Sequence, residues 1–144
     1  MSVYIDTSVL AAYYCPEAAS AAAQKLLSTS QRPVISWLTH VEMSSALSRK
    51  VREQTLSRHD AERIASVFRE HTGAGYFTIL QVEGADYERA ALRIGRFDNK
   101  LRALDAIHLA IAEREALSVA TADRTMAAEA KRIGLKVNLI GAES

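Results

Sequence analysis

The 144-residue sequence lacks the features that mark several special classes of protein. Its one cysteine, Cys15, excludes an internal disulfide and any metal cluster built from cysteines. No apolar run reaches the roughly 18 residues of a membrane span, and the N-terminus lacks the basic-then-apolar order of a secretion signal. We therefore expect a protein of the reducing cytoplasm with no membrane partner.

Neither sign of charge dominates the sequence. The 18 basic and 17 acidic residues give a formal net charge of +1, which argues neither for nor against a nucleic-acid partner. Hydrophobic residues make up 49% and charged residues 24%, as in an ordinary globular protein. Because no repeat, low-complexity tract or linker divides the chain, residues 1–144 are expected to form one domain.

Short segments rich in β-branched and aromatic residues alternate with longer segments of helical spacing. The predicted strands are Val3–Asp6, Pro33–Trp37, Tyr76–Val82, Leu117–Thr121 and Lys136–Ile140. The predicted helices are Val9–Tyr14, Glu17–Ser28, Leu38–Arg52, Ser57–His71, Ala85–Phe97, Leu101–Glu115 and Thr125–Ile133. Pro16 suits a first helical position, Ser57 an N-cap and Gly134 a C-cap. The alternation predicts an α/β domain with a mainly parallel central sheet of four to five strands flanked by helices.

Two aspartates close predicted strands, Asp6 the first and Asp123 the fourth. Ligands of such sheets bind beyond the carboxyl ends of the strands, so both residues are expected where chemistry would occur. Either residue could instead be a helix N-cap, because aspartate is a favoured residue at that position.

Two further acids lie on apolar faces of predicted helices. Asp105 stands in ALDAIHLAIA, where the only other polar residue is His108. A buried carboxylate must be paired, neutralised or metal-bound, and an ion pair with Arg102 is the structural alternative. We interpret His108 as a satisfied core or interface histidine in preference to a catalytic base. For Glu42, in WLTHVEMSSAL, the alternative to a functional role is that of an ordinary exposed surface glutamate.

Taken together, these acids predict a metal site. Clustered carboxylates repel one another and take up protons unless a cation holds them. Hard oxygen ligands of this kind suit Mg²⁺ or Mn²⁺, which bind through a few carboxylates together with substrate phosphate. Asp6 is therefore expected to share a divalent cation with the other acids.

Four stretches of the sequence resemble the signature blocks of the PIN domain, and more narrowly the VapC ribonuclease toxins of toxin–antitoxin pairs. The stretches are YIDTSVLAAYY, SWLTHVEMSSAL, LRALDAIHLAIA and VATADRTMAAEAKRIGLKV, which occur in that order over nearly the whole chain. The resemblance implies a Mg²⁺- or Mn²⁺-dependent endoribonuclease that dimerises and is held inactive by a cognate antitoxin protein.

The resemblance also implies roles for particular residues. The four acids of the family fall on Asp6, Glu42, Asp105 and Asp123, as catalytic residues and metal ligands. The hydroxyl residues Ser8 and Thr121 match family positions that would hydrogen-bond the metal ligands or metal-bound waters. Whether one or two metal ions act is left open.

The reaction expected on this basis is hydrolysis of RNA by in-line attack of water, leaving 5′-phosphate and 3′-hydroxyl ends. Substitution Asp6→Ala is expected to abolish cutting and to leave the fold intact. Basic residues that lead into the Asp105 helix or adjoin Asp123 are the candidate contacts to RNA phosphates: Arg96, Lys100, Arg102 and Arg124. For at least two of them, an ordinary solvated side chain is the favoured alternative.

Other functions remain open at the level of sequence. The chain could be a housekeeping RNA-processing nuclease without an antitoxin, or a non-catalytic RNA- or protein-binding module in which the acids are caps. A phosphotransfer enzyme of the haloacid-dehalogenase type places a second aspartate two residues after the first, where Ser8 stands here.

Overall fold

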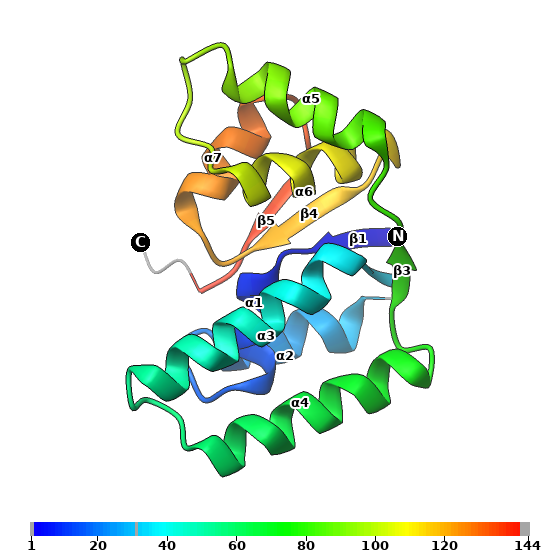
Figure 1. Cartoon of the computed structure of the whole chain (residues 1–144). Coiled ribbons are helices and arrows are strands. Elements are labelled where there is room, and N and C mark those ends of the chain that lie inside the picture. Colours follow the sequence, from blue (N-terminus) through cyan, green and yellow to red (C-terminus); the bar gives the residue numbers. More distant parts are fainter. Residues whose placement is uncertain (1, 31, 142–144) are drawn as a thin grey trace.

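A parallel sheet lies at the centre of the structure, a computed structural model that describes residues 2–30 and 32–141 (Figure 1). Its strands are β1 (Ser2–Ile5), β2 (Arg32–Ser36), β3 (Thr78–Leu80), β4 (Ser118–Thr121) and β5 (Val137–Leu139). The strand order is β3-β2-β1-β4-β5, and each neighbouring pair is parallel. The predicted α/β class is therefore confirmed, and among the described residues the sheet is parallel throughout.

Helices cover both faces of this sheet. They are α1 (Thr7–Tyr14), α2 (Ser20–Thr29), α3 (Trp37–Arg52), α4 (Arg58–Gly73), α5 (Gly84–Ile94), α6 (Ala103–Arg114) and α7 (Arg124–Arg132). In Figure 1, α5, α6 and α7 lie on one side of the sheet and α1 to α4 on the other. No helix within the described ranges has both the length and the apolar character needed to cross a membrane.

Alternate residues of the central strand β1 feed two separate cores. Val3 and Ile5 pack with residues of α1 to α4, such as Val9. Tyr4 packs on the opposite face with residues of α5, α6 and α7, such as Leu109. Because successive side chains of a strand point to opposite faces, Asp6 continues on the Tyr4 side, toward α6.

The helix ends agree with most of the predicted caps. Ser57 precedes α4, and its hydroxyl accepts a hydrogen bond from the backbone N–H of Asp60 at 3.0 Å, as an N-cap should. Gly134 follows α7 with a φ of +90°, a conformation that favours glycine, and its N–H donates to the carbonyl of Lys131.

The prediction that Pro16 opens the second helix is wrong, because α2 begins at Ser20. The Ser20 hydroxyl accepts a hydrogen bond from the N–H of Glu17 and donates one to the carbonyl of Cys15, each at 2.9 Å. These bonds hold the segment between α1 and α2 in a turn, where serine competes well with helical hydrogen bonding.

The carboxyl edge of the sheet brings together segments that are far apart in the sequence. Helices α1, α3 and α7 follow β1, β2 and β4, so their first turns lie at this edge. Helix α6 precedes β4 and must run in the opposite direction, which places its first turn at the same edge. The four acids singled out in the sequence lie at the N-caps or within the first two turns of these four helices.

Candidate metal site at the carboxyl edge

Asp6 follows β1 directly and is 6% exposed. It occupies the N-cap position of α1, but its side chain makes no capping hydrogen bond. Its Oδ2 accepts hydrogen bonds from Ser8 Oγ at 2.7 Å and from Thr121 Oγ1 at 2.8 Å. A capping role therefore does not account for Asp6.

Ser8 and Thr121 link the two strand ends at which Asp6 and Asp123 stand. Ser8 Oγ accepts a hydrogen bond from the N–H of Ala122 at 2.9 Å, in the turn after β4. Thr121 Oγ1 accepts one from the N–H of Asp123 at 3.0 Å. Both hydroxyls also donate to Asp6, so they fix this carboxylate relative to the β4–α7 turn.

Asp123 does cap a helix. Its Oδ1 accepts hydrogen bonds from the backbone N–H groups of Thr125 at 2.8 Å and Met126 at 3.2 Å, at the start of α7. The alternative role of Asp123 as a helix N-cap is therefore confirmed, and both capping bonds use the same carboxylate oxygen. Capping also orients the side chain at the carboxyl edge.

Asp105 lies in the first turn of α6 and is half-buried. Burial raises the pKa of its carboxyl above the usual range, and the negative charges of Asp6 and Asp123 raise it further. The charges of Arg102 and His108 act in the opposite direction. Arg102 forms no ion pair with Asp105 in the described part of the chain, so that alternative is not what the fold adopts.

Glu42, on the second turn of α3, is held from two sides. Thr7 Oγ1 donates to its Oε1 at 2.8 Å, and His108 Nε2 contacts the same oxygen. Burial alone would raise the pKa of Glu42, but the hydrogen bond and charge of His108, together with the hydrogen bond of Thr7, hold the pKa below its usual range. With a side chain 18% exposed, Glu42 is not the ordinary surface glutamate of the alternative.

The four acids are therefore not equivalent. The charges of Asp6 and Asp123 act on Asp105, whereas Glu42 is hydrogen-bonded to His108. His108 itself is fully buried and makes hydrogen bonds through both ring nitrogens, as expected for a satisfied core histidine. Its partner at Nδ1, Tyr4, was not identified from the sequence.

The predicted basic contacts are all exposed, but they are not equally near the acids. Arg102 immediately precedes α6, and Arg124 is the first residue of α7, next to Asp123. Arg96 instead lines a small cavity of about 80 Å³ with Arg93 and Arg132, between the ends of α5 and α7. Lys100 is in the loop before α6, and its backbone N–H donates to Glu129 at 3.4 Å.

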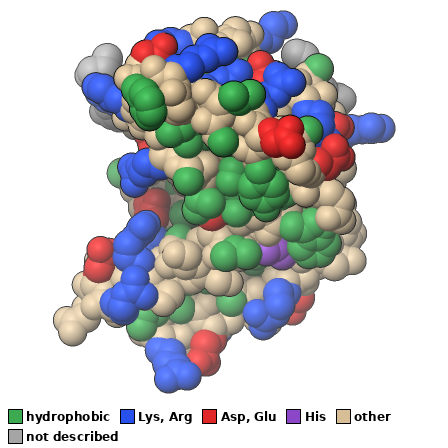
Figure 2. Space-filling view, turned by 45° about the horizontal axis from the view of Figure 1, so that its top comes forward, with side chains coloured by type: hydrophobic (Ala, Val, Ile, Leu, Met, Phe, Trp, Pro, Cys, Tyr) green, Lys and Arg blue, Asp and Glu red, His purple; other side chains and the backbone are tan. Residues whose placement is uncertain are grey.

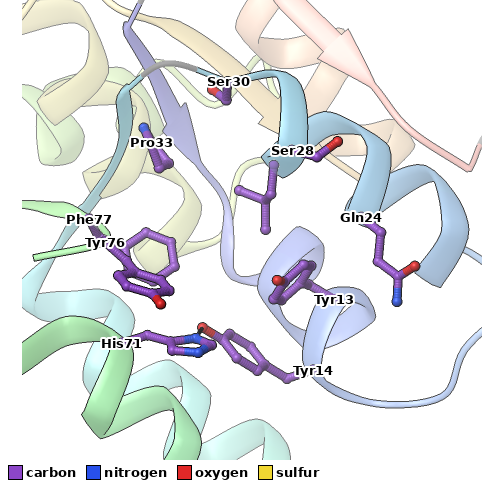
Figure 3. Close-up of a pocket in the computed structure, with 10 residues that line it drawn as sticks. Tyr13, Tyr14, Gln24, Ser28, Ser30, Pro33, His71, Tyr76 and Phe77 are labelled. Carbon is purple, nitrogen blue, oxygen red and sulfur yellow. Dashed lines mark hydrogen bonds between the residues drawn. The ribbon is translucent and has the colours of Figure 1, made fainter. Parts of the chain in front are cut away.

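A larger cavity, of about 560 Å³, lies away from the acids (Figure 3). Its wall contains Pro33 near the start of β2 and Phe77 just before β3, so it is at the amino-terminal edge of the sheet. Tyr14 and His71 point toward each other in this cavity. None of the described residues that line it is an acid, and the chemistry predicted from the sequence does not belong to it.

The donor set at the carboxyl edge fits a hard divalent cation in its chemistry. Carboxylate oxygens are the ligands of Mg²⁺ and Mn²⁺, and the mutual repulsion at Asp105 is of the kind that a cation relieves. As the side chains stand, no three His, Cys, Asp or Glu residues within residues 2–30 and 32–141 are arranged to hold one ion. Binding would therefore require the carboxylates to turn toward a common point.

The sequence profile of the PIN domain matches residues 3–132 of the chain. The chain belongs to the PIN domain family. The match includes the four acids and ends before β5, which completes the sheet of this PIN domain. Among curated proteins, none matches the sequence.

Solved structures share the fold of this PIN domain at low sequence identity. VapC20 of Mycobacterium tuberculosis, a Sarcin-Ricin loop cleaving toxin, has a TM-score of 0.68 and 18% identity over 88% of this chain and 94% of its own. FitAB bound to a DNA fragment has a TM-score of 0.72 and 18% identity, over 99% of this chain and 97% of its own. VapBC2 of Rickettsia felis, bound to a fragment of promoter DNA, has a TM-score of 0.67 and 13% identity, over 97% of this chain and 99% of its own.

Proposed function

We propose that this PIN domain is a metal-dependent endoribonuclease that hydrolyses RNA phosphodiester bonds, and that it is the toxin of a toxin–antitoxin pair. The observation that carries the proposal is the convergence of Asp6, Asp105 and Asp123 from three distant parts of the sequence, where burial and the charges of Asp6 and Asp123 raise the pKa of Asp105. Clustered like charges destabilise a fold, and acids with perturbed pKa values are typical of functional sites.

The three aspartates would hold the cation, with Glu42 beside them. Bound there, Mg²⁺ or Mn²⁺ would supply neutralising charge to a scissile phosphate and activate the attacking water. Asp6 is fixed by the Ser8 and Thr121 hydroxyls, so its carboxylate is oriented before any ligand arrives.

RNA would approach the same edge through its phosphates. Arg102 and Arg124 flank the acids at the starts of α6 and α7 and are the favoured contacts. In Figure 2, acidic side chains lie in a notch at the left edge of the molecule, with Lys and Arg side chains around it. Lys100 and Arg96 remain candidates at greater distance along the α5–α6 loop.

Two protein partners belong to the proposal. A toxin-antitoxin complex from Klebsiella pneumoniae shares this fold, and by that likeness we propose a cognate antitoxin for this chain. We also propose a homodimer. Large hydrophobic side chains are exposed on α3 and α5, among them Val41 at 67% and Tyr87 at 55%, and Figure 2 shows hydrophobic side chains gathered in the middle of one face.

Cleavage of a total RNA pool by the purified protein tests the reaction. The wild type is expected to cut RNA in the presence of Mn²⁺, and both a chelator and the isosteric substitution Asp6→Asn should reduce cutting at least 100-fold. Asp60→Asn, which changes an exposed aspartate on α4, is the matched control and should leave cutting unchanged.

A wild-type protein that binds RNA without cutting it would favour the non-catalytic module instead. Cutting without any dependence on Asp6 would show that the site lies elsewhere.

A further inference from the structure

A chain of buried hydrogen bonds leads from the core of the sheet to Glu42. The hydroxyl of Tyr4, a fully buried residue of β1, contacts Ser36 Oγ at 2.9 Å and His108 Nδ1 at 2.5 Å. The other ring nitrogen of His108 contacts Oε1 of Glu42. This series of hydrogen bonds thus runs from β1 through α6 to α3.

The chemistry of these groups sets the direction of the last bond. An ionised carboxylate only accepts hydrogen bonds, so His108 must donate from Nε2 to Glu42. The contact of Tyr4 with Nδ1 holds the ring so that Nε2 faces α3. Thr7 donates to the same oxygen of Glu42, and the two donors together restrict the orientation of this carboxylate.

The surroundings argue against a purely structural role. Tyr4 packs among apolar side chains such as Leu109 and Val119, and His108 is fully buried beside it. Well-packed hydrophobic residues would serve stability there as well or better. The network also does not close within the core. It ends on a partly exposed acid at the carboxyl edge of the sheet.

We propose that Tyr4 and His108 are positioning residues that hold the Glu42 carboxylate in place for the metal site. The inference rests on the proposed nuclease function, because it gives Glu42 a part in the reaction. Outer groups that orient a metal ligand typically change metal affinity or activity by about 10–100-fold when they are removed.

The chain contains a matched control for Tyr4. Tyr14 makes the same kind of bond, from its hydroxyl to Nδ1 of His71 at 2.6 Å, in the cavity at the opposite edge of the sheet (Figure 3). Both residues lose only an oxygen on substitution to phenylalanine. Because both variants lose one tyrosine hydroxyl, a difference between them reflects where that hydroxyl lies in the structure.

A double-mutant cycle tests the inference, with Mn²⁺ affinity from calorimetry and the rate of RNA cutting as readouts. Tyr4→Phe should weaken Mn²⁺ binding and slow cutting by about tenfold, whereas Tyr14→Phe should change each by less than about twofold. In a Glu42→Gln background, Tyr4→Phe should have no further effect, because its route to the site is already broken.

Substitutions of His108 provide a second test that does not depend on Tyr4→Phe folding. His108→Gln, which can present an amide N–H to Glu42, should keep more Mn²⁺ affinity than His108→Leu, even where leucine gives the higher melting temperature. Equal behaviour of Tyr4→Phe and Tyr14→Phe, or an effect of Tyr4→Phe that persists without Glu42, would overturn the inference. A wild type that neither binds Mn²⁺ nor cuts RNA would instead remove the proposed function on which the inference rests.

Discussion

At the scale of single residues, the sequence identifies the acids better than their surroundings. Asp6 and Asp123 could be predicted at one sheet edge because each follows a short apolar strand. The bond between Tyr4 and His108 could not, because the two are 104 residues apart and each alone resembles an ordinary core residue. Only the packing of β1 against α6 brings them together.

Asp105 gives the clearest residue-scale prediction for stability. Because burial and the charges of Asp6 and Asp123 raise its pKa in the folded state, ionised Asp105 opposes folding at neutral pH. We expect Asp105→Asn to melt about 2 °C or more above the wild type at pH 7 in chelator, measured by circular dichroism, and to have lost RNA cutting.

The sign of the pH dependence follows from linkage. A raised folded pKa means that the folded protein binds more protons than the unfolded chain, so the cost of Asp105 is complete above the folded pKa and disappears as the pH falls. The advantage of Asp105→Asn should therefore shrink as the pH falls through the raised folded pKa, and be lost below about pH 4, the usual value for aspartate. A variant less stable than wild type at pH 7 would contradict the account.

At the scale of elements, the type and order of helices and strands follow from the sequence, whereas their ends depend on local hydrogen bonds. The start of α2 is the clearest example, because the bonds of Ser20 to Glu17 and Cys15 outweigh the preference of Pro16 for a first helical turn. The caps at Ser57 and Gly134 were predictable because they depend on properties of the residue itself. Ser57 caps through its hydroxyl, and Gly134 adopts a positive φ that favours glycine.

Among the contacts between α5 and α6 is an ion pair whose acid is buried. Arg114, at the end of α6, donates from Nε and Nη2 to the two carboxylate oxygens of Asp86 at 2.9 and 3.0 Å. Asp86 is 2% exposed and also accepts from the backbone N–H of Glu83 at 2.9 Å. Burial alone would raise the pKa of Asp86, but these hydrogen bonds and the Arg114 charge hold it below the usual range.

Removal of this acid should destabilise the fold without touching the carboxyl edge. We expect Asp86→Ala to lower the free energy of unfolding by about 3 kcal/mol in urea at pH 7, because it removes two charged hydrogen bonds to Arg114 and the bond from the Glu83 N–H. Arg114 keeps Glu83 and Glu115 as more exposed partners. Since the folded pKa of Asp86 is depressed, its contribution is present above about pH 4 and is lost as the pH falls through the folded value. The difference between variant and wild type should therefore narrow in acid.

The control for this prediction is Arg58→Ala, which breaks the exposed pair with Glu62 on α4. It should cost less than about 1 kcal/mol, as exposed ion pairs do. Equal costs for the two variants would mean that the Asp86–Arg114 pair does not hold α5 against α6.

At the scale of the whole molecule, the parallel sheet explains why acids from distant segments share one edge. The class of the sheet was predictable, because strands and helices alternate along the sequence. The strand order β3-β2-β1-β4-β5 was not, and it is this order that places β1 beside β4 and so Asp6 beside Thr121.

Assembly is the property of the whole molecule that follows from its surface. We expect the purified chain to sediment at about twice its mass of 15.8 kDa, and the double substitution Val41→Glu with Tyr87→Glu to yield monomers. Val67→Glu, at an exposed hydrophobic residue on α4, is the control and should leave the dimer intact. A monomeric wild type across micromolar concentrations would refute the proposed dimer.

The central claim is that Asp6, Asp105 and Asp123 turn toward one divalent cation. Anomalous diffraction from crystals grown with Mn²⁺ measures this most directly. The account predicts one anomalous peak at the carboxyl edge, with oxygens of all three aspartates within about 2.3 Å of it. Crystals soaked in Mn²⁺ that show no peak there, or a peak bound by only one of these residues, would contradict it.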